Sequence, residues 1–205
     1  TLPRSKPRCF EDLIAEVAII RPGPIQGNAV HPYLRRRQGR EKVTYLHPKL
    51  KPILEETLGV IIYQEQVIQA AIVIAGFTAG EADSLRRAMS RKRSKEAMAK
   101  LEQRFLEGAQ RNGVNQGTAK LVFKKIASFA EFGFCKAHAA ALAGTTFRSA
   151  WLKLHYPCEY YCALLNCQPM GFYSLETLKE DARRHGIRIL NPDINKSQAK
   201  CVIEG

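Results

Sequence analysis

Apolar residues recur at helical spacing through most of the chain. Residues 10–20 show the pattern first, with Phe10, Leu13, Ile14 and Val17 three or four positions apart, before an Arg-Pro-Gly-Pro turn that cannot continue a helix. The same spacing, bounded by Gly and Pro, predicts helices over residues 64–75, 94–111, 115–132, 137–155 and 174–185, with others opened by Pro48, Thr78 and Pro157. The pattern predicts a mainly α fold, an elongated multi-helix domain with one or two short extended segments.

Several local signals fix where these helices begin and end. Thr78 and Glu81 have the spacing of a capping box, and Gly76 and Gly186 follow the last residues of two predicted helices. Residues 60–63, Val-Ile-Ile-Tyr, predict a brief buried strand or an extended link. The Tyr-Gln-Glu-Gln run over residues 63–66 fits either a polar cluster at a groove or an ordinary helix start.

The length of 205 residues suits one domain with an appendage. We expect a helical core over residues 1–170 and a small helical appendage over residues 171–205. No apolar run reaches membrane-spanning length, no signal peptide is apparent, and an opening in Thr-Leu-Pro-Arg suggests a piece of a longer polypeptide. These features predict a cytoplasmic location.

Positive charge is abundant and unevenly distributed. The chain has 32 Lys and Arg against 19 Asp and Glu, a formal net charge of +13. One dense cluster runs from Arg86 to Lys125, and a second is formed by Arg35, Arg36 and Arg37. Clustered cations indicate a polyanionic partner, for which nucleic acid is the first expectation. A solvated basic face and a binding site for an acidic protein are the alternatives.

The six cysteines lack the paired short spacings of a zinc site. Cys158, Cys162 and Cys167 lie four and five positions apart on a predicted helix. We therefore expect no metal site, no cysteine nucleophile and reduced, buried thiols.

Two groups of cations lie at or near predicted helix termini. Lys136 and His138 follow a Gly-containing turn at the start of a long helix, where free backbone N–H groups favour a phosphate. A lysine there is disfavoured by the helix dipole, so we interpret Lys136 as part of a site that awaits an anion. Arg86 and Arg87 point about 100° apart on a helix, so that only one can face a ligand squarely. The alternatives are a packed, hydrogen-bonded His138 and solvated arginines.

Four segments in order carry a resemblance to a known family. They are Arg-Pro-Gly-Pro at 21–24, Val-Ile-Ile-Tyr-Gln-Glu-Gln at 60–66, Ala-Asp-Ser-Leu-Arg-Arg-Ala-Met at 82–89, and Phe-Gly-Phe-Cys-Lys-Ala-His at 132–138. The chain resembles the fingers domain of the bacterial C-family replicative polymerase, the DNA polymerase III alpha subunit. Residues 25–37, 168–173 and 181–186 are most similar to the error-prone alpha-subunit paralogue used in damage-induced mutagenesis.

The resemblance implies part of a DNA-directed DNA polymerase that binds the incoming deoxynucleoside triphosphate and the primer-template. It implies triphosphate contacts from Arg86, Arg87, Lys136, His138 and Arg21, and the basic clusters imply DNA-backbone contacts from Arg35, Arg36, Arg37, Arg91, Lys92 and Arg93. The family's metal-binding aspartates would lie upstream, so we expect no catalytic residue and no metal ligand here, with Mg²⁺ bound outside this chain.

One departure from the family and one alternative function remain. Cys135, Ala137, Ala139 and Leu142 stand where the family pattern has Asn, two Ser and Tyr, so hydroxyls that could support phosphate contacts are missing. A sliding clamp and other replication or mutagenesis proteins would bind through regions outside these residues. The alternative function is a non-enzymatic, basic helical module that binds nucleic acid or associates with a clamp.

Overall fold

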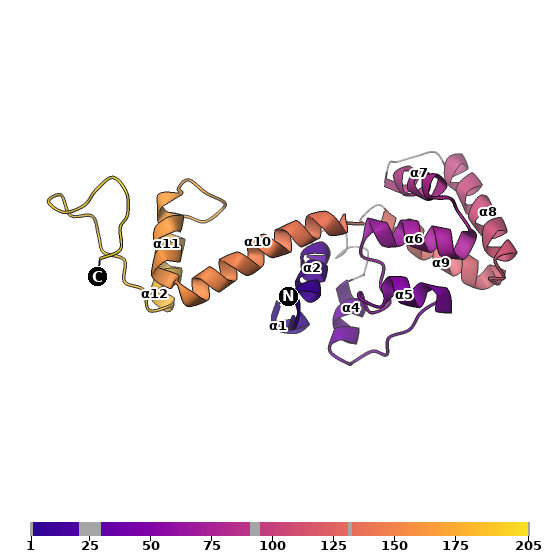
Figure 1. The fold of residues 1–205 in the computed structure, drawn as a ribbon, viewed down its shortest axis with the longest axis horizontal. Coiled ribbons are helices and arrows are strands. Elements are labelled where there is room, and N and C mark those ends of the chain that lie inside the picture. Colours follow the sequence, from indigo (N-terminus) through magenta and orange to yellow (C-terminus); the bar gives the residue numbers. More distant parts are fainter. Residues whose placement is uncertain (1, 21–29, 91–94, 131–132, 205) are drawn as a thin grey trace. The chain divides into compact units, whose positions relative to one another are not determined.

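The computed structural model describes residues 2–20, 30–90, 95–130 and 133–204 (Figure 1). Regular structure in these ranges is helical, and the predicted mainly α fold is confirmed. The elements are α1 (Leu2–Ser5), α2 (Phe10–Ile19), α4 (Val30–Arg37), η1 (Pro48–Leu50), α5 (Lys51–Leu54), α6 (Gln64–Ala75), α7 (Ala79–Ser90), α8 (Lys95–Arg111), α9 (Gln116–Ala130), α10 (Lys136–His155), α11 (Pro157–Asn166) and α12 (Leu175–Arg184).

The chain forms two compact units, residues 1–143 and residues 144–205. Helix α10 begins in the first unit and ends in the second. The predicted boundary between residues 170 and 171 concerns domains of the intact protein and stays a prediction. None of the described helices is both long enough and apolar enough to cross a membrane.

The predicted helix ends are present where the structure describes them. Thr78 and Glu81 form the capping box, in which the Thr78 N–H donates to Glu81 Oε2 at 2.8 Å and the Glu81 N–H donates to Thr78 Oγ1 at 3.2 Å. Gly76 ends α6 with φ of 61°, in the left-handed region that favours glycine. Ser174 caps α12 by accepting from the Thr177 N–H. Local sequence was sufficient for these ends because each contact spans only a few residues.

Helix α6 is the centre of the larger apolar cluster in the first unit. Val67, Ala70, Ala71 and Ile74 are fully buried on α6, which packs against α7, α8 and α9. The backbones of α6 and α8 approach closely: a Cβ placed on Gly108 would lie 2.0 Å from the Ala75 carbonyl oxygen. This close approach fixes the position of α8 beside the end of α6.

A second apolar cluster in the first unit joins α2, α4 and the start of α10. Its buried members include Ala18, Tyr33, Ile62 and Ala139. Residues 60–63 are buried but form no strand; Tyr63 makes an isolated parallel bridge with Phe134 instead. The extended link, one of the two predicted alternatives, is therefore the one observed.

The second unit contains the end of α10 with α11 and α12. Asp181 Oδ2 accepts from Lys153 Nζ and from the Tyr161 hydroxyl, both at 2.7 Å. These two bonds, the one from Lys153 first, hold the pKa of Asp181 below its usual range. Tyr161 is the buried residue of α11.

The expectation of buried thiols is wrong. All six cysteines are free, Cys162 is half-buried, and the other five are exposed. Tyr161 is the one fully buried residue of α11, whereas Cys158 on this helix and Cys167 just after it are exposed. Helical spacing in the sequence did not show how little of this helix is covered within the described chain.

Candidate phosphate-binding site

The starts of α6 and α10 lie side by side, although they are far apart in sequence. The Gln64 N–H donates to the Phe134 carbonyl at 3.0 Å, and the Phe134 N–H donates to the Ile62 carbonyl at 3.2 Å. These two bonds make the bridge between Tyr63 and Phe134. We call the region around this bridge the α6–α10 junction. It comprises Glu56, residues 62–66, residues 133–138, and Asp83, Arg86 and Arg87 of α7.

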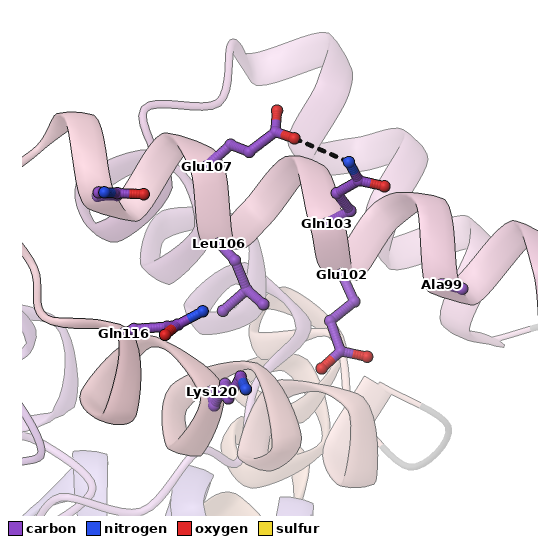
Figure 2. Close-up of a pocket in the computed structure, with 8 residues that line it drawn as sticks. Ala99, Glu102, Gln103, Leu106, Glu107, Gln116 and Lys120 are labelled. Atoms are coloured by element: carbon purple, nitrogen blue, oxygen red, sulfur yellow. Dashed lines mark hydrogen bonds between the residues drawn. The ribbon is translucent and has the colours of Figure 1, made fainter.

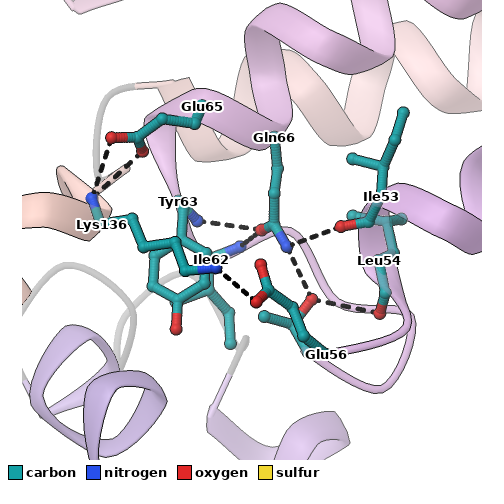
Figure 3. Close-up of polar contacts among 9 residues, drawn as sticks. Ile53, Leu54, Glu56, Ile62, Tyr63, Glu65, Gln66 and Lys136 are labelled. Carbon is teal, nitrogen blue, oxygen red and sulfur yellow. Dashed lines mark hydrogen bonds and ion pairs between the residues drawn. The ribbon is translucent and has the colours of Figure 1, made fainter. Parts of the chain in front are cut away.

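Gln66 fixes the backbone on one side of the junction (Figure 3). Its buried Oε1 accepts from the N–H groups of Ile62 and Tyr63 at 2.8 and 3.0 Å. Its Nε2 donates to the Ile53 carbonyl and to Thr57 Oγ1 at 3.1 and 2.9 Å. Tyr63 is the N-cap of α6 and the Gln66 side chain accepts from its N–H, so the polar run over residues 63–66 is a helix start whose capping amide also binds the carbonyl of Ile53 in α5 and the Thr57 hydroxyl.

Lys136 is the first residue of α10, as its sequence context predicted, and it meets two carboxylates (Figure 3). Its backbone N–H donates to both oxygens of Glu65 at 3.0 and 3.1 Å. Its Nζ pairs with Glu56 Oε2 at 2.5 Å and lies 5.5 Å from the centre of the Tyr63 ring. The protein therefore supplies its own anions at this helix start, and the argument that Lys136 requires an external one is wrong.

His138 is exposed on the first turn of α10. Its ring centre lies 5.3 Å from that of Phe134, at an angle of 45°. Aromatic packing against Phe134 therefore orients the imidazole, which belongs to the second residue after Lys136.

Arg86 and Arg87 share one carboxylate on α7. Arg86 donates to Asp83 Oδ1 at 2.9 Å, and Arg87 pairs with Asp83 Oδ2 at 2.9 Å. Their side chains differ in exposure: 24% for Arg86 and 59% for Arg87. Arg86 is thus the positioned member of the pair, and Arg87 is the more accessible one.

Gln64 connects the arginine pair to the start of α10. Its Oε1 accepts from Arg86 Nη1 at 3.2 Å, and its Nε2 donates to the Gly133 carbonyl at 3.0 Å. One amide thus links α7 to the segment that precedes Lys136. The structure thus links Arg86 through Gln64 to the segment before Lys136, and Arg87 joins this group through Asp83.

The cluster Arg35, Arg36 and Arg37 is largely engaged within the protein. The Arg36 side chain is 10% exposed, pairs with Glu41, and donates to the Leu58 carbonyl at 2.7 Å. Arg37 binds Asp12 and donates to the Ser5 carbonyl at 3.1 Å. Arg35 pairs with Glu41 at 2.8 Å, and its side chain is 54% exposed. Two of the three arginines therefore tie α4 to neighbouring segments, while Arg35 faces solvent.

Four predicted contact residues lie outside the described residues: Arg21, Arg91, Lys92 and Arg93. Their roles stay predictions.

Carboxylates of the protein pair with the cations of the junction. Lys136 is paired with Glu56, and Arg86 and Arg87 are paired with Asp83. Burial raises the pKa of the Tyr63 hydroxyl, which stays neutral beside Lys136.

The same carboxylates do not fit a Mg²⁺ site. Magnesium prefers free carboxylate oxygens, whereas Glu56, Glu65 and Asp83 already bind Lys, Arg or a backbone N–H. In the described part of the chain, no group of three or more His, Cys, Asp or Glu side chains could hold a metal ion.

A groove of the first unit lies between α8 and α9 (Figure 2). The groove is lined by polar side chains, among them Glu102, Gln103, Glu107, Gln116 and Lys120. Gln103 Nε2 donates to Glu107 Oε1 at 3.0 Å. None of the predicted triphosphate contacts that the structure describes, Arg86, Arg87, Lys136 and His138, lines this groove.

Comparison with known proteins agrees with the sequence motifs. The family model for the bacterial DNA polymerase III alpha subunit finger domain matches residues 1–113, which include Arg86 and Arg87. The chain is 53% identical over 201 residues to an error-prone DNA polymerase of Symbiobacterium thermophilum, covering 98% of this chain. It is 52% identical to those of Cutibacterium acnes and Nocardia farcinica, covering 99% and 100% of the chain. The chain spans 18% of the length of each of these relatives. It belongs to the family of bacterial DNA polymerase III alpha subunit finger domains.

Proposed function

We propose that this chain is part of an error-prone DNA polymerase and that its first unit binds the triphosphate of the incoming deoxynucleotide during templated DNA synthesis. The observation that carries the proposal is the α6–α10 junction. There Gln64 and the Tyr63–Phe134 bridge bring Arg86 close to the start of α10. Similarity to error-prone DNA polymerases over nearly the whole chain supplies the reaction: transfer of a nucleotidyl group to a primer end.

The ion pairs of the junction suggest how the triphosphate would bind. Asp83 and Glu56 hold the guanidinium and ammonium groups in place before the nucleotide arrives. Phosphate oxygens would then replace the carboxylates, so that each cation exchanges one anionic partner for another. Fixed cations next to the phosphates stabilise the charge that develops as pyrophosphate leaves. Mg²⁺, which would bind outside this chain, supplies the activation of the primer hydroxyl in such reactions.

DNA contacts are proposed for Arg35, whose side chain is exposed, and for three cations that lie outside the described residues. Arg35, Arg91, Lys92 and Arg93 would bind the backbone of the primer-template without reading its sequence. Arg36 and Arg37 have structural roles instead, because their guanidinium groups bind the carbonyls of Leu58 and Ser5. A cytoplasmic location and clamp binding through other regions of the protein complete this proposal.

The second candidate is a basic helical module that binds nucleic acid without catalysis. The net charge of +13 is the observation that favours it. Such a module would bind DNA equally well with and without nucleotide, whereas a polymerase binds the nucleotide matching the template base more tightly on a primer-template.

The proposal is tested by single-nucleotide incorporation with the intact polymerase, at saturating primer-template, for wild type and Lys136→Ala. A hydrogen bond to a charged group contributes about 1.5–3 kcal/mol, so we expect the incorporation efficiency to fall about 10- to 150-fold. Lys153→Ala is the matched control, because Lys153 also pairs with a carboxylate, at 2.7 Å, but lies in the second unit. Equal losses in both variants would contradict a triphosphate contact by Lys136.

A further inference from the structure

Helix α9 carries a run of exposed lysines and no acidic residue. Lys120, Lys124 and Lys125 are all exposed, and none of the fifteen residues of α9 is Asp or Glu. We call these three side chains the lysine face of α9. The triphosphate site described above does not include it.

The opposite face of α9 is firmly packed. Ala119, Val122, Phe123 and Ile126 are buried in the main apolar cluster of the first unit. The helix start is capped by Asn115, whose Oδ1 accepts from the Thr118 N–H at 2.8 Å. The lysines therefore project from a rigid support, which reduces the entropy lost when they bind a ligand.

The lysines of this face differ from the cations described above in their pairing. Within the described ranges, no ion pair involves Lys120, Lys124 or Lys125, whereas Arg36, Arg87 and Lys136 each pair with a carboxylate. Cations that neutralise no protein carboxylate remain available to neutralise phosphates, which releases the counterions condensed on the nucleic acid.

The spacing of the lysines suits a phosphodiester backbone. Lys120 and Lys124 are one helical turn apart, about 6 Å along the helix axis. Phosphates on one strand of duplex DNA recur about every 3.4 Å along the duplex axis, so these lysines span roughly two steps. Glu102 and Glu107 line the groove beside Lys120 (Figure 2), so attraction for an anion is strongest toward Lys124 and Lys125.

At the other end, the lysine face adjoins a second groove. Lys125 lines this groove together with Thr44, Tyr45 and Leu46. The Thr44 hydroxyl and the Tyr45 hydroxyl are groups that commonly donate to phosphate oxygens. The groove thus joins the lysine face of α9 to the segment that precedes η1.

We propose that the lysine face of α9 binds the phosphate backbone of duplex nucleic acid, without sequence preference and apart from the triphosphate site. The proposal rests on the proposed function, since a polymerase holds a duplex primer-template. Charge complementarity and the absence of acids on α9 favour a nucleic-acid backbone over an acidic protein, whose carboxylates are not evenly spaced.

The test measures the binding of a fluorescent, mixed-sequence primer-template to the intact polymerase by anisotropy at 50–200 mM NaCl. The variant changes Lys120, Lys124 and Lys125 to Gln, and the control changes the exposed Lys51, Lys196 and Lys200 to Gln. Each lost phosphate contact lowers the slope of log K against log salt by about 0.9. We expect the slope of the triple Gln variant to be smaller than the wild-type slope by about 2.7. Between 50 and 200 mM NaCl, the factor by which its affinity falls should therefore be about 40-fold smaller than the wild-type factor.

Further measurements separate charge from folding and this proposal from the preceding one. Changing the same three lysines to Arg should restore the wild-type slope, because charge is retained. The apparent affinity for deoxynucleotide at saturating primer-template should stay at the wild-type value in all three variants. A slope for the Gln variant that equals the control slope overturns the proposal, even if the polymerase incorporates nucleotides. A weaker nucleotide affinity in the Gln variant alone would also overturn it, since the lysine face would then belong to the triphosphate site.

Discussion

Glu65 is the residue whose removal tests the architecture of the junction most simply. Its carboxylate accepts from the Lys136 N–H through both oxygens, at 3.0 and 3.1 Å, and so acts as a cap supplied from another helix. Loss of a cap costs about 1 kcal/mol, and loss of a negative charge at a helix N-terminus costs about 0.3–1 kcal/mol. An unsatisfied, part-buried N–H adds to this cost, so we expect Glu65→Ala to destabilise the start of α10 by about 1.5–2.5 kcal/mol.

Amide hydrogen exchange on the intact polymerase measures this local free energy without unfolding other domains. In a peptide covering residues 134–143, exchange should become about 10- to 70-fold faster in Glu65→Ala. Glu65→Gln keeps an acceptor and loses only the charge, which corresponds to about a two- to fivefold increase. Glu176→Ala removes an acidic residue from the first turn of α12 and is the matched control.

The refuting result is a protection pattern that does not distinguish Glu65→Ala from Glu176→Ala over residues 134–143. In that case the contact between Glu65 and Lys136 would not hold the two helix starts together. The self-supplied anion would then no longer explain why a lysine is tolerated as the first residue of α10.

Two further predictions concern stability. Gly108→Ala should destabilise the first unit by about 1–3 kcal/mol, because the new Cβ would lie 2.0 Å from the Ala75 carbonyl oxygen. Gly113→Ala is the control: its Cβ would have no atom within 4 Å, and only its φ of 74° causes strain. Exchange in peptides from α6 and α8 should rise far more in the first variant, and equal effects would contradict the close approach of the helices. The second prediction concerns Asp181, whose pKa is lowered first by the hydrogen bond from Lys153 and then by that from Tyr161. Because of this lowered pKa, the Asp181 carboxylate takes up a proton more readily in the unfolded chain than in the folded one. The ionised Asp181 therefore stabilises the second unit above the ordinary carboxyl pKa of 3.8, and this stabilisation is lost as the pH falls through the lower pKa of the folded state. Amide exchange over α11 should therefore differ between wild type and Asp181→Asn at neutral pH and become equal in acid.

The sequence predicted those parts of the fold that depend on neighbours in the chain. The capping box at Thr78 and the cap at Ser174 were recognisable because donor and acceptor are three residues apart. Helix α4 was not predicted, although Tyr33 and Leu34 are the apolar positions that it buries. Its polar, Arg-rich composition concealed this short apolar face.

The candidate site was predictable in its cations but not in their partners. Lys136 at the start of α10 was evident from the turn before it. Glu56 and Glu65, which are 80 and 71 residues away in sequence, could not be assigned to it from spacing. The same limit applies to Arg36, which was expected to bind DNA but donates to the carbonyl of Leu58, 22 residues away. Only the folded chain shows which cations are already paired.

The central claim is that the α6–α10 junction binds the triphosphate, and the most direct test compares two arginines of similar exposure. Arg87 is 59% exposed and pairs with Asp83 at 2.9 Å, and Arg35 is 54% exposed and pairs with Glu41 at 2.8 Å. The measurement is the dissociation constant of the correct deoxynucleotide from single-turnover incorporation by the intact polymerase. The account predicts that Arg87→Ala raises this constant about tenfold or more and leaves primer-template affinity near wild type, while Arg35→Ala does not change the nucleotide constant. Equal nucleotide constants for the two variants would contradict it.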